Sequence, residues 1–242
     1  MKTIWYLVKF CEKEEWADDF IKGNLYLNRL SYFKKKEAKD DYRFDKCEAV
    51  ASWLQPSGIS INFSSHPELD IHPEDLGAPV SISFDHHDHL HILCLYAIHT
   101  GRFECVDGLI DCSEEDVDEL KEQLRIHENC FKFGGYAIIV KANDFLNRVK
   151  NAIEKSRYAG RMKLVDYYDP NLFNGNFLDH DIPFKKQQKH SYQNEFRIAV
   201  NNGTAGDDPL CIEVGDLSDI SAKVEAVKLN GLFLTAYWNL NL

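Results

Sequence analysis

The chain lacks the cysteine pattern of a disulfide framework or a zinc knuckle. Its seven cysteines are odd in number, and none forms a Cys-x-x-Cys pair, so we expect reduced thiols, as in a cytoplasmic protein. Basic residues are also few, because 28 lysines and arginines stand against 39 acids, a formal net charge of −11. That charge repels nucleic acid over most of the surface, so a polynucleotide contact would need a local basic patch.

Long apolar runs and several well-known catalytic motifs are absent as well. No segment approaches the roughly 20 apolar residues of a membrane span, and residues 1–15 show no small-residue cleavage site of a secretory leader. The sequence contains neither a glycine-rich phosphate loop nor a Gly-x-Ser-x-Gly motif. We therefore expect a cytoplasmic protein that does not contact membranes.

The hydrophobic pattern predicts an α+β fold. Hydrophobic residues make up 44% of the 242 residues, enough for one domain over residues 1–242. Apolar periodicity predicts strands at 3–10, 134–140 and 161–169, helices at 12–23, 113–128 and 143–153, and hairpins over 79–98 and around Asn230-Gly231. Because the strands outnumber the helices and do not alternate with them, we expect mixed, mostly antiparallel sheets with a few flanking helices.

The segment Asp-His-His-Asp-His-Leu-His, residues 85–91, is a candidate metal site. Imidazoles and carboxylates are good ligands for zinc or iron, and His87, His89 and His91 would share one face of a strand. The other interpretation is a solvated hairpin turn, and a turn tip offers neither a dry cavity nor ligands from a second element. The site prediction therefore includes no metal ligand, and a metal-dependent hydrolase or nuclease built on residues 85–91 stays an alternative.

Two further charged stretches admit two interpretations each. Lysines at 34–36 and 185–189, Lys189 among them, could hold the phosphates of a nucleotide or lie on a solvated surface. The segment 42–48 carries Arg43, Asp45 and Glu48, which could form an internal salt-bridge cluster or bind a polar ligand.

The strongest candidate is the alternating segment from Gln193 to Val200. In a strand, Gln193, Glu195 and Arg197 share one face, opposite the apolar residues Phe196, Ile198 and Val200, with successive Cα atoms on a face about 6.5–7 Å apart. Glu195 could accept hydrogen bonds from a ribose hydroxyl and stabilise an oxocarbenium-like centre. Gln193 could orient the nucleophile and Arg197 could bind the carboxylate or a phosphate. The alternative is an ordinary solvent-facing strand with a Glu–Arg pair.

The order of several short motifs resembles a family of uncharacterised bacterial proteins. These are Leu-Val-Lys-Phe at 7–10, Gly-Asn-Leu-Tyr-Leu-Asn at 23–28, a glycine-preceded strand at 134–140, Leu-Val-Asp-Tyr at 164–167 and Tyr-Gln-Asn-Glu-Phe-Arg at 192–197. Each motif is weak, and their order over residues 4–200 is the specific part. Members of that family often occur among phage-defence or mobile-element genes.

The same layout is more distantly similar to ADP-ribosyltransferases. That resemblance implies an ADP-ribosyltransferase-like fold that binds NAD and acts at its N-glycosidic bond, with Glu195 and Gln193 as the catalytic pair. Lys9 would occupy the strand-one position and Tyr96 the middle position. NAD would be held by Lys9, Tyr96, Lys189, Arg197 and Arg43. Glu195→Gln would then abolish nicotinamide release and leave the melting temperature near that of the wild type. A non-enzymatic interaction or sensor protein with the same fold is the second hypothesis.

Overall fold

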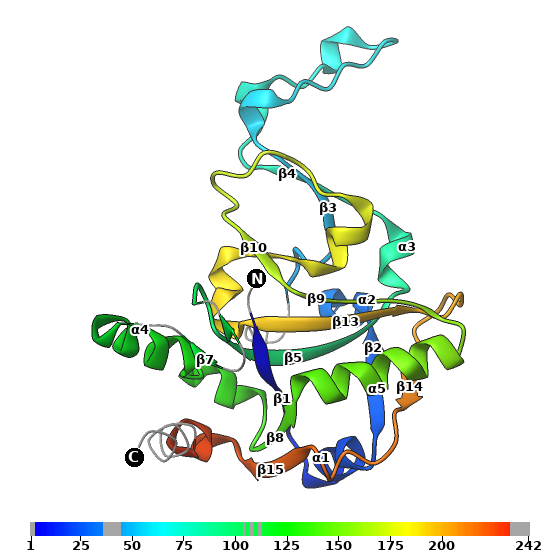
Figure 1. Cartoon of the computed structure of the whole chain (residues 1–242). Helices are drawn as coiled ribbons and strands as arrows, with labels where there is room; N and C mark the ends of the chain where they lie inside the picture. Colours follow the sequence, from blue (N-terminus) through cyan, green and yellow to red (C-terminus); the bar gives the residue numbers. More distant parts are fainter. Residues whose placement is uncertain (1–2, 36–44, 104, 107–108, 111–112, 233–242) are drawn as a thin grey trace.

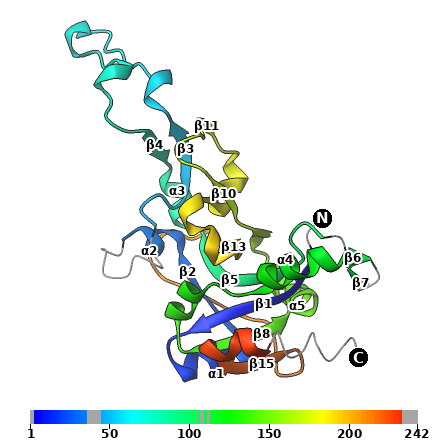
Figure 2. The ribbon, with the colours of Figure 1, turned by 90° about the vertical axis from the view of Figure 1, so that its left-hand side faces the viewer.

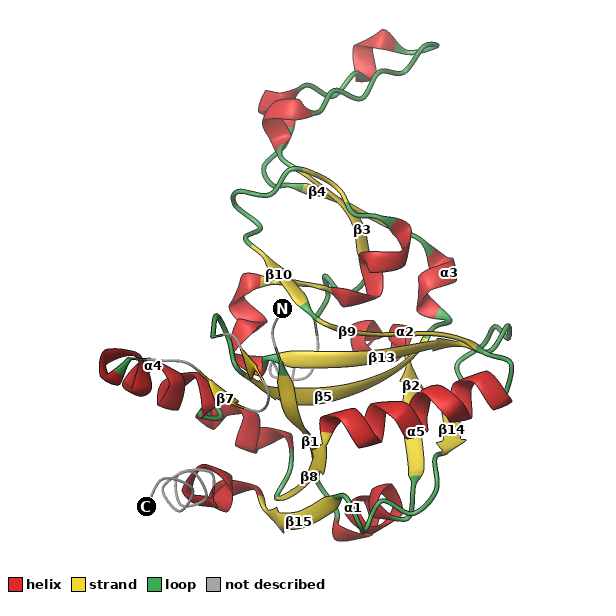
Figure 3. Ribbon diagram, in the orientation of Figure 1, coloured by secondary structure: helices red, strands yellow, loops and turns green. Residues whose placement is uncertain are grey.

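The structure is a computed structural model that describes residues 3–35, 45–103, 105–106, 109–110 and 113–232. Its centre is an eight-stranded antiparallel sheet (Figures 1 and 3). The main path through the sheet is β14 (Leu210–Glu213), β2 (Asn24–Arg29), β5 (His91–His99), β1 (Ile4–Cys11), β8 (Tyr136–Lys141) and β15 (Ser221–Glu225). On the other edge of β5, β13 (Glu195–Asn201) pairs in turn with β9 (Ala159–Leu164). The predicted α+β class with mostly antiparallel sheets is confirmed.

Two helices cover one face of this sheet (Figure 1). They are α1 (Glu14–Ile21) and α5 (Ala142–Lys155). Phe145, Val149 and Ile153 recur every fourth residue on α5, so they lie on one side of the helix and are buried against the strands. Phe20 of α1 stacks on Phe145 with ring centroids 5.7 Å apart. This helix-covered face holds the largest apolar cluster of the described residues, and the sequence predicted both helices correctly.

A tight turn after α1 explains the glycine at its end. Gly23 has φ +89°, a conformation that L side chains rarely adopt. A Cβ atom at this position would lie 2.0 Å from the backbone oxygen of Gly215. Only glycine therefore allows the chain to leave α1 and enter β2 at this point.

The opposite face of the sheet is covered by a second layer of short elements (Figure 2). It contains the parallel pair β10 (Asp166–Tyr168) and β12 (Lys185–Gln187), and a three-stranded sheet of β11 (Gly175–Asn176), β3 (Val50–Leu54) and β4 (Val80–Ser83). Two 3₁₀ helices, η5 (Asp179–Phe184) and η6 (Gln188–Gln193), connect these strands to β13. The short helices α2 (Leu30–Lys35) and α3 (Asp85–Asp88) lie beside the layer.

The remaining helix, α4 (Glu114–Leu124), lies near the end of β5. Ser113 and Asp116 form the predicted capping box, in which each side chain accepts from the other's backbone N–H, at 3.3 and 3.2 Å. In the chain, the short strand pair β6 (Cys105–Val106) and β7 (Leu109–Ile110) precedes α4, and the 3₁₀ helix η4 (Glu128–Phe133) follows it.

Between β3 and β4 the chain forms a projecting arm, residues 55–79, at the top of Figure 1. Four prolines interrupt it, which explains why it consists of short 3₁₀ turns, η1 (Pro56–Gly58), η2 (Pro67–Leu69) and η3 (Pro73–Asp75), instead of strands. A single bridge between Ile61 and Ile71 joins its two limbs.

The hairpin predicted over residues 79–98 is wrong, and so is the hairpin turn predicted at Asn230-Gly231; residues 233–242, where the second strand of that hairpin was expected, lie outside the described residues. In residues 79–98, β4 pairs with β3 and β5 enters the central sheet, with α3 between them. Asn230 and Gly231 lie in helical residues 229–232. There the Asn230 amide makes two hydrogen bonds of 2.9 Å to the backbone N–H and carbonyl of Ile126. A long-range partner has taken the polar groups that would otherwise favour a local turn.

Within the described residues, no helix combines the length and the apolar character needed to cross a membrane.

Candidate functional site

The polar side of β13 faces the second layer and not the solvent. Phe196, Ile198 and Val200 pack into the cluster beneath α1 and α5, so alternation turns Glu195 and Arg197 to the opposite face. The strand begins at Glu195, two residues later than predicted. Gln193 ends η6, and Asn194 between them is left-handed, with φ 39° and ψ 50°, a conformation that asparagine tolerates better than most residues.

Arg197 is the centre of a buried charge network. Its Nη1 and Nη2 donate to the two carboxylate oxygens of Glu48 at 2.5 and 2.9 Å. Its Nε donates to Oε1 of Glu195 at 2.6 Å, and Nη1 also donates to the Pro183 carbonyl at 2.6 Å. Arg197 is only 2% exposed. The planar guanidinium thus binds two carboxylates and one carbonyl at once, a geometry for which arginine is the best side chain.

Lys186 closes the network from β12. Its Nζ donates to Oε1 of Gln193 at 2.7 Å and to Oε2 of Glu195 at 3.1 Å, and lies 4.0 Å from Oε2 of Glu48. Glu48, Lys186, Glu195 and Arg197, the charge network, therefore contain two positive and two negative charges. These formal charges cancel inside a region that excludes water.

Electrostatics keeps the network ionised. Burial by itself would raise the pKa of Glu195, but Arg197 and Lys186 outweigh it and hold that pKa far below its usual range. Burial would lower the pKa of Lys186, yet the carboxylates of Glu195 and Glu48 raise it. The charges of Glu195 and Lys186 are thus maintained by their partners, so removing one partner leaves another charge buried without compensation.

Further polar groups surround the network. The backbone N–H of Glu195 donates to the Tyr167 hydroxyl at 2.9 Å, and burial raises the pKa of that hydroxyl. Asp45 accepts from the backbone N–H of Cys47 at 2.9 Å, and its second oxygen lies 3.5 Å from Nε2 of the buried His190. Burial favours protonation of Asp45, while His190 and the Cys47 N–H bring its pKa below the ordinary value.

Glu195 has no free access to a ligand. It is 5% exposed, and each of its carboxylate oxygens already accepts a hydrogen bond from a buried cation. A ribose hydroxyl could reach it only by entering this buried region beside Lys186 and Arg197. The arrangement therefore holds the second layer on the sheet, because Glu48 lies two residues before β3, Lys186 belongs to β12 and Arg197 belongs to β13.

Lys9 does not share this site, so that expectation is wrong. Leu7 and Cys11, two residues before and after it on β1, pack beneath α1 and α5, and Lys9 must project to the same side. Its Nζ donates to the backbone carbonyl of Cys94 at 3.3 Å. The body of the sheet separates it from Glu195.

The other predicted ligand-binding residues are dispersed. Tyr96 is the Cα partner of Glu195 across β5 and β13, but its hydroxyl donates to the Arg125 carbonyl at 3.3 Å. Lys189 is exposed on η6. Arg43 lies outside the described residues. The structure thus brings together Gln193, Glu195 and Arg197, turns the Tyr96 hydroxyl to Arg125 and leaves Lys9 and Lys189 outside the network.

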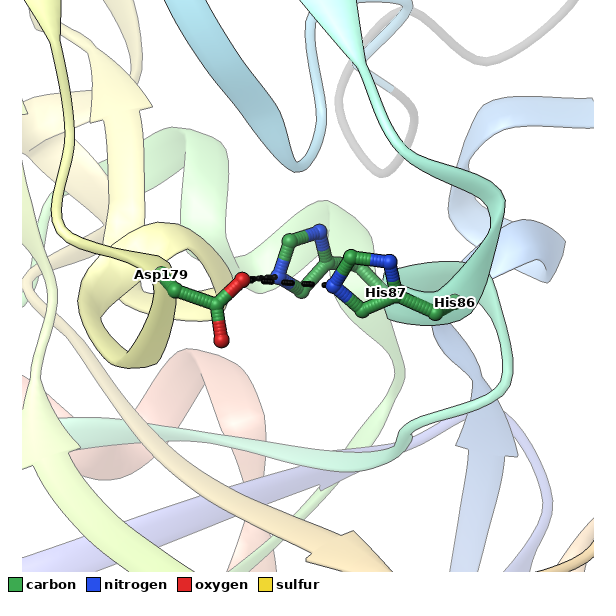
Figure 4. Close-up of side chains that lie close together, drawn as sticks. All are labelled: His86, His87 and Asp179. Atoms are coloured by element: carbon green, nitrogen blue, oxygen red, sulfur yellow. Dashed lines mark hydrogen bonds and ion pairs between the residues drawn. The ribbon is translucent and has the colours of Figure 1, made fainter.

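The histidine-rich segment forms a different arrangement from the predicted strand face. Residues 85–88 are the short helix α3, so His87, His89 and His91 do not line one strand. His91 is buried in β5, where its Nε2 lies 3.2 Å from the Asp208 carbonyl. Instead, neighbouring His86 and His87 both approach Asp179 of η5 (Figure 4).

In this cluster the two Nε2 atoms face the same carboxylate oxygen. Oδ1 of Asp179 is 3.2 Å from Nε2 of His86 and 3.0 Å from Nε2 of His87. Burial lowers the pKa of His87, as does the neighbouring His86, and the hydrogen bond from His86 lowers the pKa of Asp179. The imidazole of His87 is therefore favoured in its neutral form and Asp179 as a carboxylate.

Comparison with known proteins adds no relative: no family model, curated protein or solved structure matches this chain.

Sequence reasoning missed Lys186, Pro183 and Asp179. In the sequence, Lys186 appears only as one lysine of a basic stretch, and nothing in a sequence indicates that the backbone carbonyl of Pro183 accepts a hydrogen bond. Glu48 was noticed, but its partner Arg197 is 149 residues away. The one clue for Asp179 in the sequence is the Asp-His-Asp segment at 179–181, which, like residues 85–89, consists only of aspartate and histidine.

Proposed function

We propose that this protein is a non-catalytic interaction protein whose arm, residues 55–79, binds a protein partner. One observation carries this proposal: the arm projects from the body (Figure 2), and several of its apolar side chains are exposed. Ile61, Phe63 and Leu69 are 38%, 42% and 57% exposed. Ile82 and Phe84, in β4 and just after it, are also exposed. Clustered exposed apolar groups of this kind mark interaction sites more often than inert surface.

The charge of the arm indicates the chemistry of the partner. Between residues 55 and 79 there are four acids and no lysine or arginine; the acids are Glu68, Asp70, Glu74 and Asp75. A complementary partner has an apolar recess bordered by lysines or arginines. Nucleic acid and anionic membranes are negatively charged, so the acidic arm would repel them. A second copy of this chain, at −11, would be repelled as well.

Local hydrogen bonds hold the arm in shape before any partner binds. Asp70 accepts from the backbone N–H of Phe63 at 2.8 Å and from the Asn62 amide at 2.9 Å. At the base, the Trp53 indole and the Gln55 amide each donate to the Pro170 carbonyl at 2.8 Å. A preorganised arm loses less conformational entropy on binding than a free loop would.

The experiment compares two triple variants with the wild type. Ile61→Ser/Phe63→Ser/Leu69→Ser removes the apolar groups of the arm, and Leu172→Ser/Leu178→Ser/Val227→Ser removes three apolar groups elsewhere that are even more exposed. Each immobilised protein is exposed to a lysate of the organism of origin. We expect a basic protein that the wild type and the control variant retain, that the arm variant loses, and that elutes as salt rises. An arm variant that retains the same proteins as the wild type contradicts the proposal.

NAD cleavage by Glu195 and Gln193 is the weaker candidate. In its favour, the carboxylate and the amide converge on one point, the Nζ of Lys186. Against it, that point is already occupied by a cation and enclosed. Under the catalytic hypothesis NAD binding must open the second layer, and NAD must raise the melting temperature, since a ligand that binds only the folded state stabilises it. A thermal scan with and without NAD separates the two functions.

A further inference from the structure

Three potential metal ligands converge where α3 meets η5, beyond the end of β4 that is farther from the arm. One ring nitrogen of His86, one of His87 and a carboxylate oxygen of Asp179 all lie within 4.8 Å of one another. They come from two elements, α3 and η5, that are far apart in the sequence (Figure 4). A metal site needs ligands that are fixed by more than one element of the fold. His86, His87 and Asp179 meet this condition, whereas a histidine-rich turn alone would not.

The spacing is close to that of a tetrahedral zinc site. Zinc binds histidine nitrogen and carboxylate oxygen at about 2.0–2.2 Å, so two ligands of one tetrahedron lie roughly 3.3–3.5 Å apart. The two observed nitrogen-to-oxygen distances at Asp179 are 3.2 and 3.0 Å. A small movement of the Asp179 carboxylate away from the two imidazoles would bring both distances to those of a zinc site.

The surroundings combine an anchored ligand with an open entry. His87 is 3% exposed and fixed, whereas the side chains of His86 and Asp179 are 62% and 76% exposed. The Phe84 ring stacks on His86 with centroids 5.6 Å apart and planes at 16°, which orients the imidazole. An ion can enter from the solvent side, and water can occupy its remaining coordination position.

We propose that His86, His87 and Asp179 bind a divalent transition-metal ion, with zinc as the expected occupant. Two imidazoles and one carboxylate form a borderline donor set that suits zinc better than calcium or magnesium, which prefer oxygen ligands alone. The ion would join α3, which follows the arm through β4, to η5, which leads through Pro183 to the charge network. This proposal does not depend on the arm's partner.

The test is a titration of the full-length protein with ZnCl₂ after treatment with EDTA and desalting. Calorimetry should show one zinc ion per chain, and zinc should raise the melting temperature. Asp179→Asn and His86→Ala should each weaken zinc binding at least tenfold and remove most of the thermal shift. Both side chains are largely exposed, so both variants should fold.

The matched control is His66→Ala. On the arm, His66 and Glu68 form an exposed histidine–carboxylate pair, 3.1 Å apart. This pair offers one histidine and one carboxylate, which is one ligand fewer than the proposed site. This variant should bind zinc as the wild type does. The proposal is overturned if the wild type binds no zinc, or if Asp179→Asn and His86→Ala bind it with unchanged affinity, as they would if zinc bound at cysteines elsewhere.

Discussion

Arg197→Met isolates the contribution of the charge network to stability. Methionine keeps much of the length of the arginine side chain and removes its charge and its hydrogen bonds. In the variant, the carboxylates of Glu48 and Glu195 face Lys186 as the single remaining cation of the network. The Pro183 carbonyl also loses its donor.

The expected loss is large because these groups are buried. Removing one partner of a buried ion pair costs about 3–5 kcal/mol, since the other charge stays desolvated. For a chain of this length, each kcal/mol corresponds to about 2–4 °C, so the melting temperature should fall by about 6–20 °C.

Arg102→Met is the matched control. Arg102 also binds two acids closely, Glu119 at 2.7 Å and Asp116 at 2.5 Å, but its side chain is 58% exposed. Because solvent screens exposed pairs, this variant should keep nearly the wild-type urea midpoint.

Urea unfolding followed by circular dichroism measures both variants under the same conditions. The double variant Glu48→Gln/Arg197→Met should lose less than the sum of its single variants, because the two residues contact each other. The reasoning is refuted if Arg197→Met is no more destabilising than Arg102→Met, or if the two network substitutions are additive.

Two more predictions concern acid and a long-range amide. The Glu195 pKa lies below its value in the unfolded chain, so its stabilisation is present above about pH 4.5 and is lost as pH falls. Between pH 5 and pH 3 the unfolding free energy of Glu195→Gln should decline less steeply than that of the wild type, by up to about 1.4 kcal/mol per pH unit; equal slopes contradict this. Asn230→Leu should cost about 1–3 kcal/mol in urea unfolding, because the backbone groups of Ile126 lose both partners. A neutral result would mean that water replaces the amide.

Local features of the fold could be predicted from the sequence. The four-residue spacing of Phe145, Val149 and Ile153 identified α5, and the Ser113–Asp116 capping box identified the start of α4. These signals are readable because helices form from contacts three or four residues apart. The alternation after Glu195 likewise identified β13 and its polar face.

Features that depend on distant residues could not be predicted. Alternation shows that Arg197 shares a face with Glu195. It does not show whether that face is exposed to solvent, because Glu48 and Lys186, which cover it, come from other parts of the chain. Strand pairing is equally non-local, so the patterns in residues 79–98 suggested a hairpin although β4 and β5 join different sheets. The same holds for Lys9, whose side of the sheet follows from the packing of β1.

Glu195→Gln tests most directly whether the polar face of β13 is a closed structural network or a catalytic site. Melting temperature and nicotinamide release from NAD are measured on the same samples of wild type and variant. A closed network predicts a melting temperature lower by about 6–20 °C in the variant, with no nicotinamide release by either protein above the rate without protein. Nicotinamide release by the wild type that the substitution abolishes, at an unchanged melting temperature, would contradict the closed network and establish Glu195 as catalytic.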